Sequence, residues 1–250
     1  MTVTARLKLA ARRLGLEPAA RRIYFHPKVE AAAGLVSPSH RRNVRDDRHM
    51  SLLMSFILDD RSNCIDIGAN HGTMLAQMVR LAPAGRHLAF EPIPEFADDL
   101  RRRFPTASVF PVALCDSNGT AQFSCVVGDE ALSGLSDRQL SGSNDIVHYD
   151  VSTARLDDVT PPDYAPAFIK IDVEGAEFAV LSGARETLKC YKPTIWFEHD
   201  GSSAYFNSTS EQIWDLLHGL EYRIFDSDGH GPLNREEFGK GTRMWSFVAH

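Results

Sequence analysis

The sequence predicts an α/β fold built on a mostly parallel sheet, and three observations support this prediction. Short apolar runs of strand length alternate with amphipathic stretches of helix length from about residue 63 onward. The 250 residues are enough for one large α/β domain, and 43% hydrophobic and 24% charged residues are typical of a globular chain. Neither a run of ~18 apolar residues nor a secretory signal is visible, so we expect a cytoplasmic protein without a transmembrane segment.

Residues 1–60 are expected to form a basic, helical extension that packs on the main domain as a cover. Residues 4–14 and 46–58 carry apolar residues at helical spacing, and the stretch 18–38 between them is broken by proline and glycine. The first 50 residues hold eleven Lys or Arg against four Asp or Glu, a net charge of +7 on a chain whose total is −6. This segment could contact a partner subunit or an anionic surface, or could be a solvated face on its own acidic domain. Nucleic acid is not an expected partner, because no aromatic or glycine-rich nucleic-acid motif accompanies the charge.

Residues 61–250 are expected to form the main domain, in which strands and helices alternate. Strands joined by helices of this length imply right-handed βαβ units and therefore a parallel sheet. The final stretches, 222–225 and 244–249, read as a hairpin that closes one sheet edge. The other expected strands are residues 64–67, 87–90, 107–114, 168–171 and 194–197, and the expected helices are residues 71–81, 94–104, 177–188 and 211–220.

An insertion at about residues 120–156 interrupts this alternation. Residues 120–127 and 151–156 read as additional strands around a loop rich in Ser, Gly and Asp, residues 128–150. A loop of this length in a compact domain indicates a lid or an acceptor-binding segment, although a surface insertion would look the same.

A glycine-rich turn follows the first strand, and an acidic residue follows the second. Residues 66–72 read DIGANHG, and their two glycines allow a tight turn and a close approach of backbone to a ligand. Glu91 stands 25 positions after Asp66, at the end of the next strand. A carboxylate there can accept hydrogen bonds from both ribose hydroxyls of a nucleoside. The turn could also serve only the strand-to-helix connection, with Asp66 capping the helix.

The spacing of the glycines and the charge of the turn favour one kind of nucleoside ligand. A dinucleotide needs G-x-G-x-x-G, because its pyrophosphate sits on the helix N-terminus close to the turn. Here Gly68 and Gly72 are separated by three residues, Asn70 replaces the second close glycine, and Asp66 would repel a pyrophosphate. S-adenosylmethionine carries no phosphate, and its sulfonium and ammonium groups are attracted by a carboxylate. The pattern therefore favours S-adenosylmethionine.

Several motifs stand in a fixed order along residues 60–250. They are the turn at 66–72, Phe90-Glu91-Pro92, residues 112–116 with Gly119, Leu156-Asp157-Asp158, and residues 168–177, which read FIKIDVEGAE. Together they resemble the signatures of the FkbM-type S-adenosylmethionine-dependent methyltransferases. The resemblance implies a Rossmann-like, class I methyltransferase domain over residues 61–250. Its sheet would be seven-stranded and mostly parallel, with the order 3-2-1-4-5-7-6, strand 7 antiparallel and helices on both faces.

The resemblance also implies which residues bind the cofactor. The methionine half would lie against the glycine-rich turn, the ribose against Glu91, and the adenine beside residues that follow the third strand. The residues expected to contact S-adenosylmethionine are Asp66, Gly68, Ala69, Asn70, Gly72, Glu91, Pro92, Val112 and Ala113.

Methyl transfer to a hydroxyl group requires a base within hydrogen-bond reach of that hydroxyl. The polar residues that follow the fourth and fifth strands are the candidates, namely Asp172, Glu174, Glu198 and His199, with His71 on the cofactor loop. Asp172 could equally cap a helix or position the cofactor, and His199 has the ordinary pKa best suited to a base. The sequence leaves the base unassigned.

No metal site is expected. Asp172, Glu198 and His199 could in principle hold a divalent cation, but acidic residues at strand ends are common without one. The four cysteines include no C-x-x-C pair. Residues 226–237 nearly match a calcium-binding loop, yet the residues before them read as a strand where an EF-hand needs a helix.

The sequence therefore predicts an S-adenosylmethionine-dependent methyltransferase that modifies a hydroxyl of a small-molecule acceptor, such as a sugar or a secondary metabolite. Two alternatives stay open, an NAD(P)-dependent oxidoreductase and a non-catalytic binding module with the same fold. N- or C-methylation also stays open, because no residue determines the acceptor atom.

Overall fold

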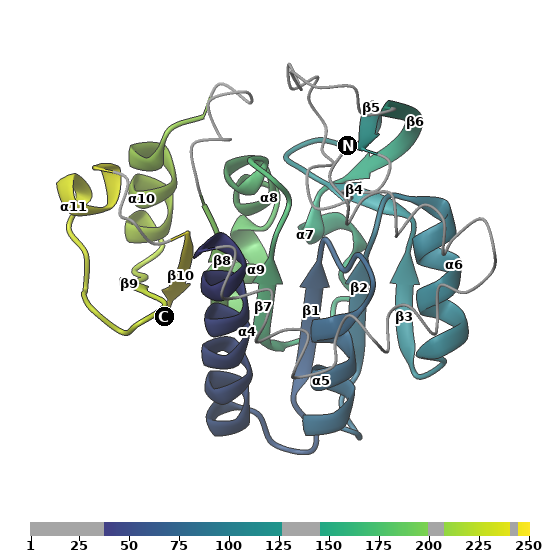
Figure 1. Cartoon of the computed structure of the whole chain (residues 1–250), viewed down its shortest axis with the longest axis horizontal. Coiled ribbons are helices and arrows are strands. Elements are labelled where there is room, and N and C mark those ends of the chain that lie inside the picture. Colours follow the sequence, from purple (N-terminus) through teal and green to yellow (C-terminus); the bar gives the residue numbers. More distant parts are fainter. Residues whose placement is uncertain (1–37, 127–145, 200–207, 241–244) are drawn as a thin grey trace.

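The computed structural model describes residues 38–126, 146–199, 208–240 and 245–250 (Figure 1). The helix predicted at 4–14 and most of the predicted loop at 128–150 lie outside these residues. Among the helices that are described, none combines the length and the apolar composition needed to cross a membrane.

A seven-stranded sheet forms the centre of the domain, in the order β3-β2-β1-β7-β8-β10-β9. The pairs from β3 to β8 are parallel, whereas β10 is antiparallel to both of its neighbours. Numbered in chain order within this sheet, the strands follow 3-2-1-4-5-7-6, so the predicted order and its antiparallel strand are confirmed. The strands are β1 Asn63–Ile67, β2 His87–Phe90, β3 Ala107–Phe110, β7 Pro166–Ile171, β8 Thr194–Glu198, β9 Ile224–Asp226 and β10 Ser246–Ala249.

Helices cover both faces of this sheet (Figure 1). The helices α4 to α6 pack on the face to which Cys64 and Ala89 point, and α8 to α10 pack on the face to which Ile65 and Phe90 point. The alternation of side chains along each strand separates these two cores. The helices are α4 Pro38–Ile57, α5 Thr73–Leu81, α6 Pro94–Arg103, α7 Leu156–Val159, α8 Glu177–Ser182, α9 Arg185–Tyr191, α10 Ser210–Gly219 and α11 Arg235–Gly239.

The second half of α4 packs on the sheet through a stripe of apolar side chains. Met50 and Met54, one helical turn apart, are buried in a cluster with Phe168 of β7 and Trp196 of β8. The helix begins at Pro38, earlier than the predicted start at residue 46, and proline is well tolerated in the first turn of a helix.

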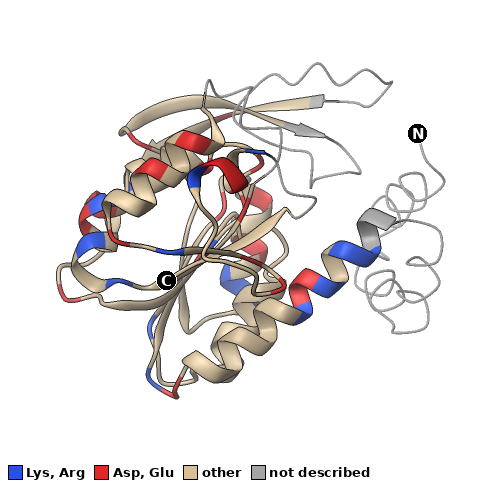
Figure 2. Ribbon diagram, turned by 90° about the vertical axis from the view of Figure 1, so that its left-hand side faces the viewer, with Lys and Arg blue, Asp and Glu red and all other residues tan. Residues whose placement is uncertain are grey.

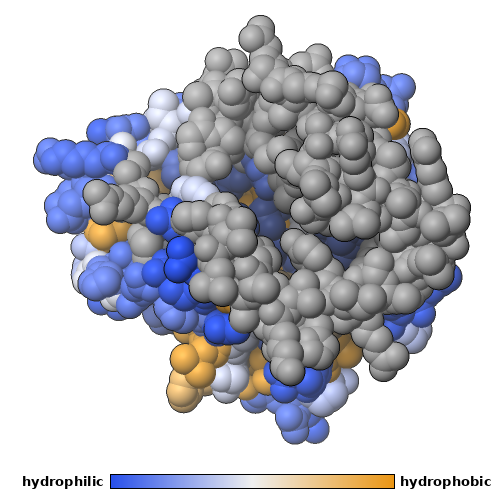
Figure 3. Space-filling model, in the orientation of Figure 1, coloured by the Kyte–Doolittle hydropathy of each residue, from blue (hydrophilic) through white to orange (hydrophobic). Residues whose placement is uncertain are grey.

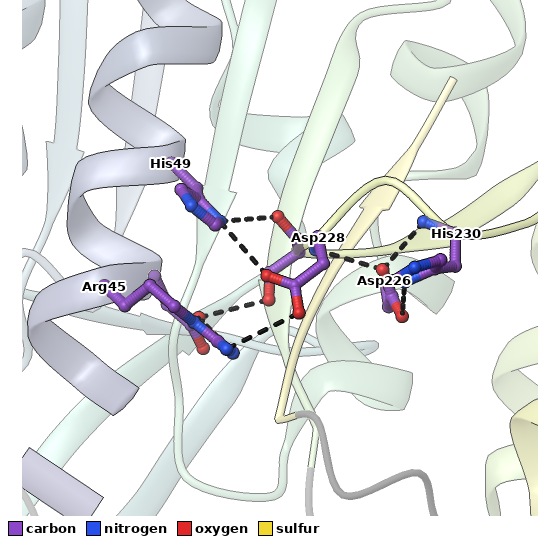
Figure 4. Close-up of polar contacts among 7 residues, drawn as sticks. Arg45, His49, Asp226, Asp228 and His230 are labelled. Carbon is purple, nitrogen blue, oxygen red and sulfur yellow. Dashed lines mark hydrogen bonds and ion pairs between the residues drawn. The ribbon is translucent and has the colours of Figure 1, made fainter. Parts of the chain in front are cut away.

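The N-terminal part of α4, up to His49, contacts the turn that follows β9. Figure 2 shows that the charged residues of α4 lie in this part of the helix. Arg45 lies 3.4 Å from the Asp228 carboxylate, and His49 Nδ1 lies 2.8 Å from the carbonyl oxygen of Ser227 (Figure 4). The strand β9 precedes this turn, so the helix that an EF-hand requires is absent there.

The predicted third strand is wrong as a single element, because it divides at Pro111. β3 stays in the main sheet, whereas β4, Val112–Leu114, joins a smaller sheet of order β4-β6-β5. Proline has no N–H to donate to the ladder, which allows the chain to leave the sheet there. The predicted additional strands correspond to β5, Gly119–Val126, and β6, Ile146–Ala154, although β6 begins within the predicted loop.

The helix predicted at residues 177–188 is divided into α8 and α9 at Gly183. A Cβ on Gly183 would lie 2.0 Å from the carbonyl oxygen of Cys115, so the backbone passes too close to β4's end for any side chain. The short helix α11 was not predicted. It lies between the two strands expected to form the final hairpin.

Candidate active site

A cleft opens at the carboxyl ends of β1, β2 and β7, where an open α/β sheet usually binds its ligand. The empty space within it and at its open mouth amounts to about 730 Å³. Its lining residues follow the three strands, and β4 and β5 of the smaller sheet add an apolar wall.

The turn after β1 forms one side of the cleft. Gly68 has a φ of +71° and Asn70 a φ of +45°, both in the left-handed region. A Cβ on Gly68 would lie 1.9 Å from the carbonyl oxygen of Asp172, so only glycine allows the β1 turn and the end of β7 to lie this close. Gly68 and Asn70 line the cleft, and the Oδ1 atom of Asn70 is buried without a hydrogen-bond partner among the described residues.

Three of the residues predicted to bind the cofactor do not line the cleft. Gly72 lies at the start of α5, where a Cβ would come within 2.5 Å of Leu100 and 2.7 Å of Phe104 on the α6 side. Ala69 is buried in the core cluster between α5 and α6. Asp66 is completely buried beneath the turn.

Glu91, which the sequence analysis expects to hold a ribose, lines the cleft at the end of β2. It is 4% exposed, and its two carboxylate oxygens accept hydrogen bonds from the N–H groups of Asn70 at 2.7 Å and Ile93 at 2.9 Å. Burial raises the pKa of Glu91 to about 7, although these two hydrogen bonds oppose the shift. Each oxygen has a further lone pair with which it can accept a proton donor of a ligand.

Apolar side chains form the wall of the cleft beside Glu91. Val112 and Ala113 of β4, which were expected to lie beside the adenine, line it together with Ile93, Phe96 and Phe123. Ile93, Phe96 and Phe123 were not predicted to line it. Phe123 belongs to the second sheet, and only tertiary structure brings it to the cleft. A flat aromatic ligand group can stack or pack against such a wall.

Lys170 is a site residue that the sequence analysis missed. It is buried beneath the β1 turn, with Nζ 2.7 Å from the carbonyl oxygen of Gly68, 3.2 Å from Asp172 Oδ2 and 3.5 Å from Asp66 Oδ1. Burial disfavours its charge, but the surrounding carboxylates outweigh this and raise the pKa of Lys170. The sequence did contain a signal for this contact, namely a lysine inside an otherwise apolar strand, two positions before an aspartate. Residues i and i+2 of a strand share a face, so these two side chains lie on the same side of the sheet.

The structure brings three of the four candidate bases together. Asp172 and Glu174 line the cleft, and Asp172 stands beside Glu198 because Ile171 pairs with Phe197 in the sheet. The negative charge of Asp172 and burial raise the pKa of Glu198 well above its ordinary value.

His199 lies apart from these carboxylates, and it is not among the residues that line the cleft. Its Nε2 atom is 2.8 Å from Ser210 Oγ at the start of α10, and its ring stacks on Phe238. Its Nδ1 atom is 3.9 Å from Glu177 Oε2 of α8. The structure therefore places His199 in a polar contact between helices.

Comparison with known proteins identifies similar sequences and folds. The family described as methyltransferase FkbM domain matches residues 66–224. The 2-O-methyltransferase NoeI of Sinorhizobium fredii (strain NBRC 101917 / NGR234) is 32% identical over 177 residues, which cover 63% of this chain and 71% of the relative.

Two solved structures are similar at lower identity. Methyltransferase FkbM from Methylobacillus flagellatus KT has a TM-score of 0.48 and 20% identity, over 77% of this chain and 44% of that chain, so this chain spans less than half of its length. An O-methyltransferase from Bacillus cereus has a TM-score of 0.41 and 16% identity, over 89% of this chain and 86% of that chain.

Proposed function

The chain belongs to the FkbM methyltransferase family, and on that premise we propose that it transfers a methyl group from S-adenosylmethionine to a hydroxyl of a small molecule. The relative from Sinorhizobium is named a 2-O-methyltransferase, which supports an oxygen acceptor. A sugar or a secondary metabolite, each rich in hydroxyl groups, is the acceptor class that we assign.

The main support for this proposal is the position of Glu91. Its buried carboxylate is held by two backbone N–H groups at the edge of the cleft, where a ribose can donate its two hydroxyls to it. The unpartnered Oδ1 of Asn70, beside the glycine turn, suits the ammonium of the methionine half. The apolar wall of Val112 and Ala113 suits the adenine. The residues present therefore fit S-adenosylmethionine.

The charges of the cleft favour this cofactor over a dinucleotide. In the described part of the chain, Glu91, Asp172 and Glu174 line the cleft, whereas no Lys or Arg does. A pyrophosphate would face these acids without a cation, whereas a ligand with positive groups is attracted. This distinction does not depend on Asp66, which lies beneath the turn.

We propose that Asp172 is the base that takes up the proton of the acceptor hydroxyl. S-adenosylmethionine supplies an activated methyl group, so the protein has to orient the acceptor, exclude water and take up this proton. Asp172 lines the cleft and its side chain is 32% exposed, so an acceptor can reach it. The charge of Asp172 and burial raise the pKa of the neighbouring Glu198 well above its ordinary value, so we assign the role of base to Asp172 and not to Glu198.

The test is methyl transfer itself. The protein is incubated with methyl-labelled S-adenosylmethionine and a panel of hydroxylated sugars and secondary metabolites, and products are identified by mass spectrometry. We expect the label on an oxygen of one acceptor class. Asp172→Asn should lower kcat about 100-fold, whereas Asp163→Asn, which changes an exposed acid paired with Arg86, should leave kcat unchanged. Labelled product on nitrogen or carbon alone, or none with any acceptor, would contradict the proposal.

A further inference from the structure

The buried ammonium of Lys170 has no role in the methyl transfer described so far. Lys170 is 6% exposed, in the apolar strand β7. Four acceptors surround its Nζ atom: the carbonyl oxygens of Gly68 at 2.7 Å and Ile67 at 3.5 Å, and the carboxylates of Asp172 at 3.2 Å and Asp66 at 3.5 Å. These acceptors belong to the turn after β1, to the end of β7 and to β1 itself.

Lys170 joins the two strand ends that form one side of the cleft. Asp66 and Lys170 are register partners in the sheet, and the Asp172 N–H donates to the Ile67 carbonyl oxygen at 3.1 Å. Because Gly68 lies in direct contact with the backbone of Asp172, a shift of either segment moves the other. The ammonium therefore holds the turn and the Asp172 side chain in one arrangement.

The surroundings of this ammonium are strongly acidic. Burial raises the pKa of Asp66 and of Glu91, and the charge of Lys170 opposes the shift at both. If this cation were removed, the neighbouring carboxylates would repel one another and bind a proton in its place. The acids that act on Lys170 or on its partners are Asp66 of β1, Glu91 after β2, Asp172 and Glu174 after β7, Glu198 of β8 and Asp47 of α4.

We propose that Lys170 is a positioning residue for the cofactor, which holds the Gly68 turn against Asp172 and supplies the fixed positive charge that balances the surrounding carboxylates. This inference rests on the proposed function, because the turn is the surface assigned to the methionine half of the cofactor. Lys170 does not line the cleft. It acts through Gly68 and Asp172 and does not touch the ligand.

The test compares S-adenosylhomocysteine binding by the full chain and by Lys170→Met, using calorimetry at pH 7.5 in buffers of different ionisation enthalpy. Affinity should fall about tenfold, because the turn loses a charged hydrogen bond. The variant should also release about one more proton per ligand bound, since the ligand's ammonium displaces the proton that replaced Lys170. A role confined to stability would not change the proton count.

Two further variants control this result. Lys192→Met removes a lysine of the surface that binds the Leu220 carbonyl oxygen and Glu221, so affinity and proton count should match the wild type. Asp66→Asn/Lys170→Met removes one carboxylate together with the cation. Its proton count should return to the wild-type value, while its affinity stays low because Gly68 still lacks its donor.

The results of these binding measurements distinguish the role of Lys170 from the proposed function. Wild-type affinity and proton count in Lys170→Met would overturn the role of Lys170 and leave the proposed function intact. If Lys170→Met does not fold, the affinity of the double variant still tests the proposal, because wild-type affinity there would overturn the role of Lys170. Failure of both variants to fold would show that Lys170 serves the whole fold and would overturn its specific role at the cofactor site. No binding of S-adenosylhomocysteine by the wild type would overturn the proposed function and this inference with it.

Discussion

At the scale of a single residue, the protonation of the Glu91 carboxylate is expected to affect the binding of a nucleoside. The carboxylate is buried, and its pKa is raised to about 7. A buried acid of this kind can stay neutral near physiological pH, and a ligand that donates two hydrogen bonds to it favours the ionised form. Binding at this site should therefore be coupled to the release of a proton.

We expect the affinity for S-adenosylhomocysteine to fall by about tenfold between pH 8 and pH 6, because the ligand must displace the proton of Glu91 below pH ~7. In Glu91→Gln the dependence on pH over this interval should disappear. The affinity at pH 8 should be about tenfold lower, since an amide accepts through one oxygen only. Calorimetry at several pH values measures both effects.

Glu95→Gln is the matched control, because Glu95 is an exposed acid in the first turn of α6. This variant should keep the wild-type affinity and the wild-type pH dependence. If the affinity of the wild-type protein is the same at pH 6 and pH 8, Glu91 does not take part in ligand binding as proposed.

At the scale of elements, α4 shows how a helix outside the βαβ units is held on the sheet. Its last turns place Met50 and Met54 on the sheet, while Leu52 and Phe56 point outward with 56% and 80% exposure. Figure 3 shows a hydrophobic patch near this end of α4. The same helix therefore has a buried and an exposed apolar side, and the two sides predict different mutational effects.

Met54→Ala should lower the free energy of unfolding by about 2–5 kcal/mol, because it removes a fully buried side chain between α4 and the sheet. Leu52→Ala, two positions away on the exposed side, should change it by less than about 0.5 kcal/mol. Urea denaturation of both variants provides the comparison. Equal effects of the two substitutions would mean that α4 is not packed on the sheet as described.

At the scale of the whole molecule, the cleft is built by segments that are far apart in the sequence. The β1 turn, the end of β2, the β4 strand and the end of β7 all contribute to it. A ligand that contacts these segments together stabilises the entire fold, because it binds only when they are assembled.

S-adenosylhomocysteine at 100 times its dissociation constant should therefore stabilise the protein by about 2.7 kcal/mol and raise Tm by about 5–10 °C. NAD at the same concentration should leave Tm unchanged, because its pyrophosphate would face the acids of the cleft. Differential scanning fluorimetry distinguishes the two ligands. A comparable rise with NAD would favour the oxidoreductase alternative.

Much of the fold and part of the site could be predicted because the information is local. The alternation of strand and helix, the glycine turn at 66–72 and the acid at Glu91 are patterns within short stretches of chain. The handedness of βαβ units explains why these strands are parallel. The sheet order, which the resemblance to the FkbM-type methyltransferases implied, is confirmed, and Glu91 lines the cleft.

Tertiary structure alone decided which polar groups meet. Lys170 and Asp66 are more than 100 positions apart, and they become a pair only because β1 and β7 are in register. The same geometry places Asp66 beneath the turn instead of in the cleft, and His199 against Ser210. A local pattern predicts where a strand or a turn lies. Which side chain lies opposite a buried charge depends on contacts between distant segments, and these form only when the chain has folded.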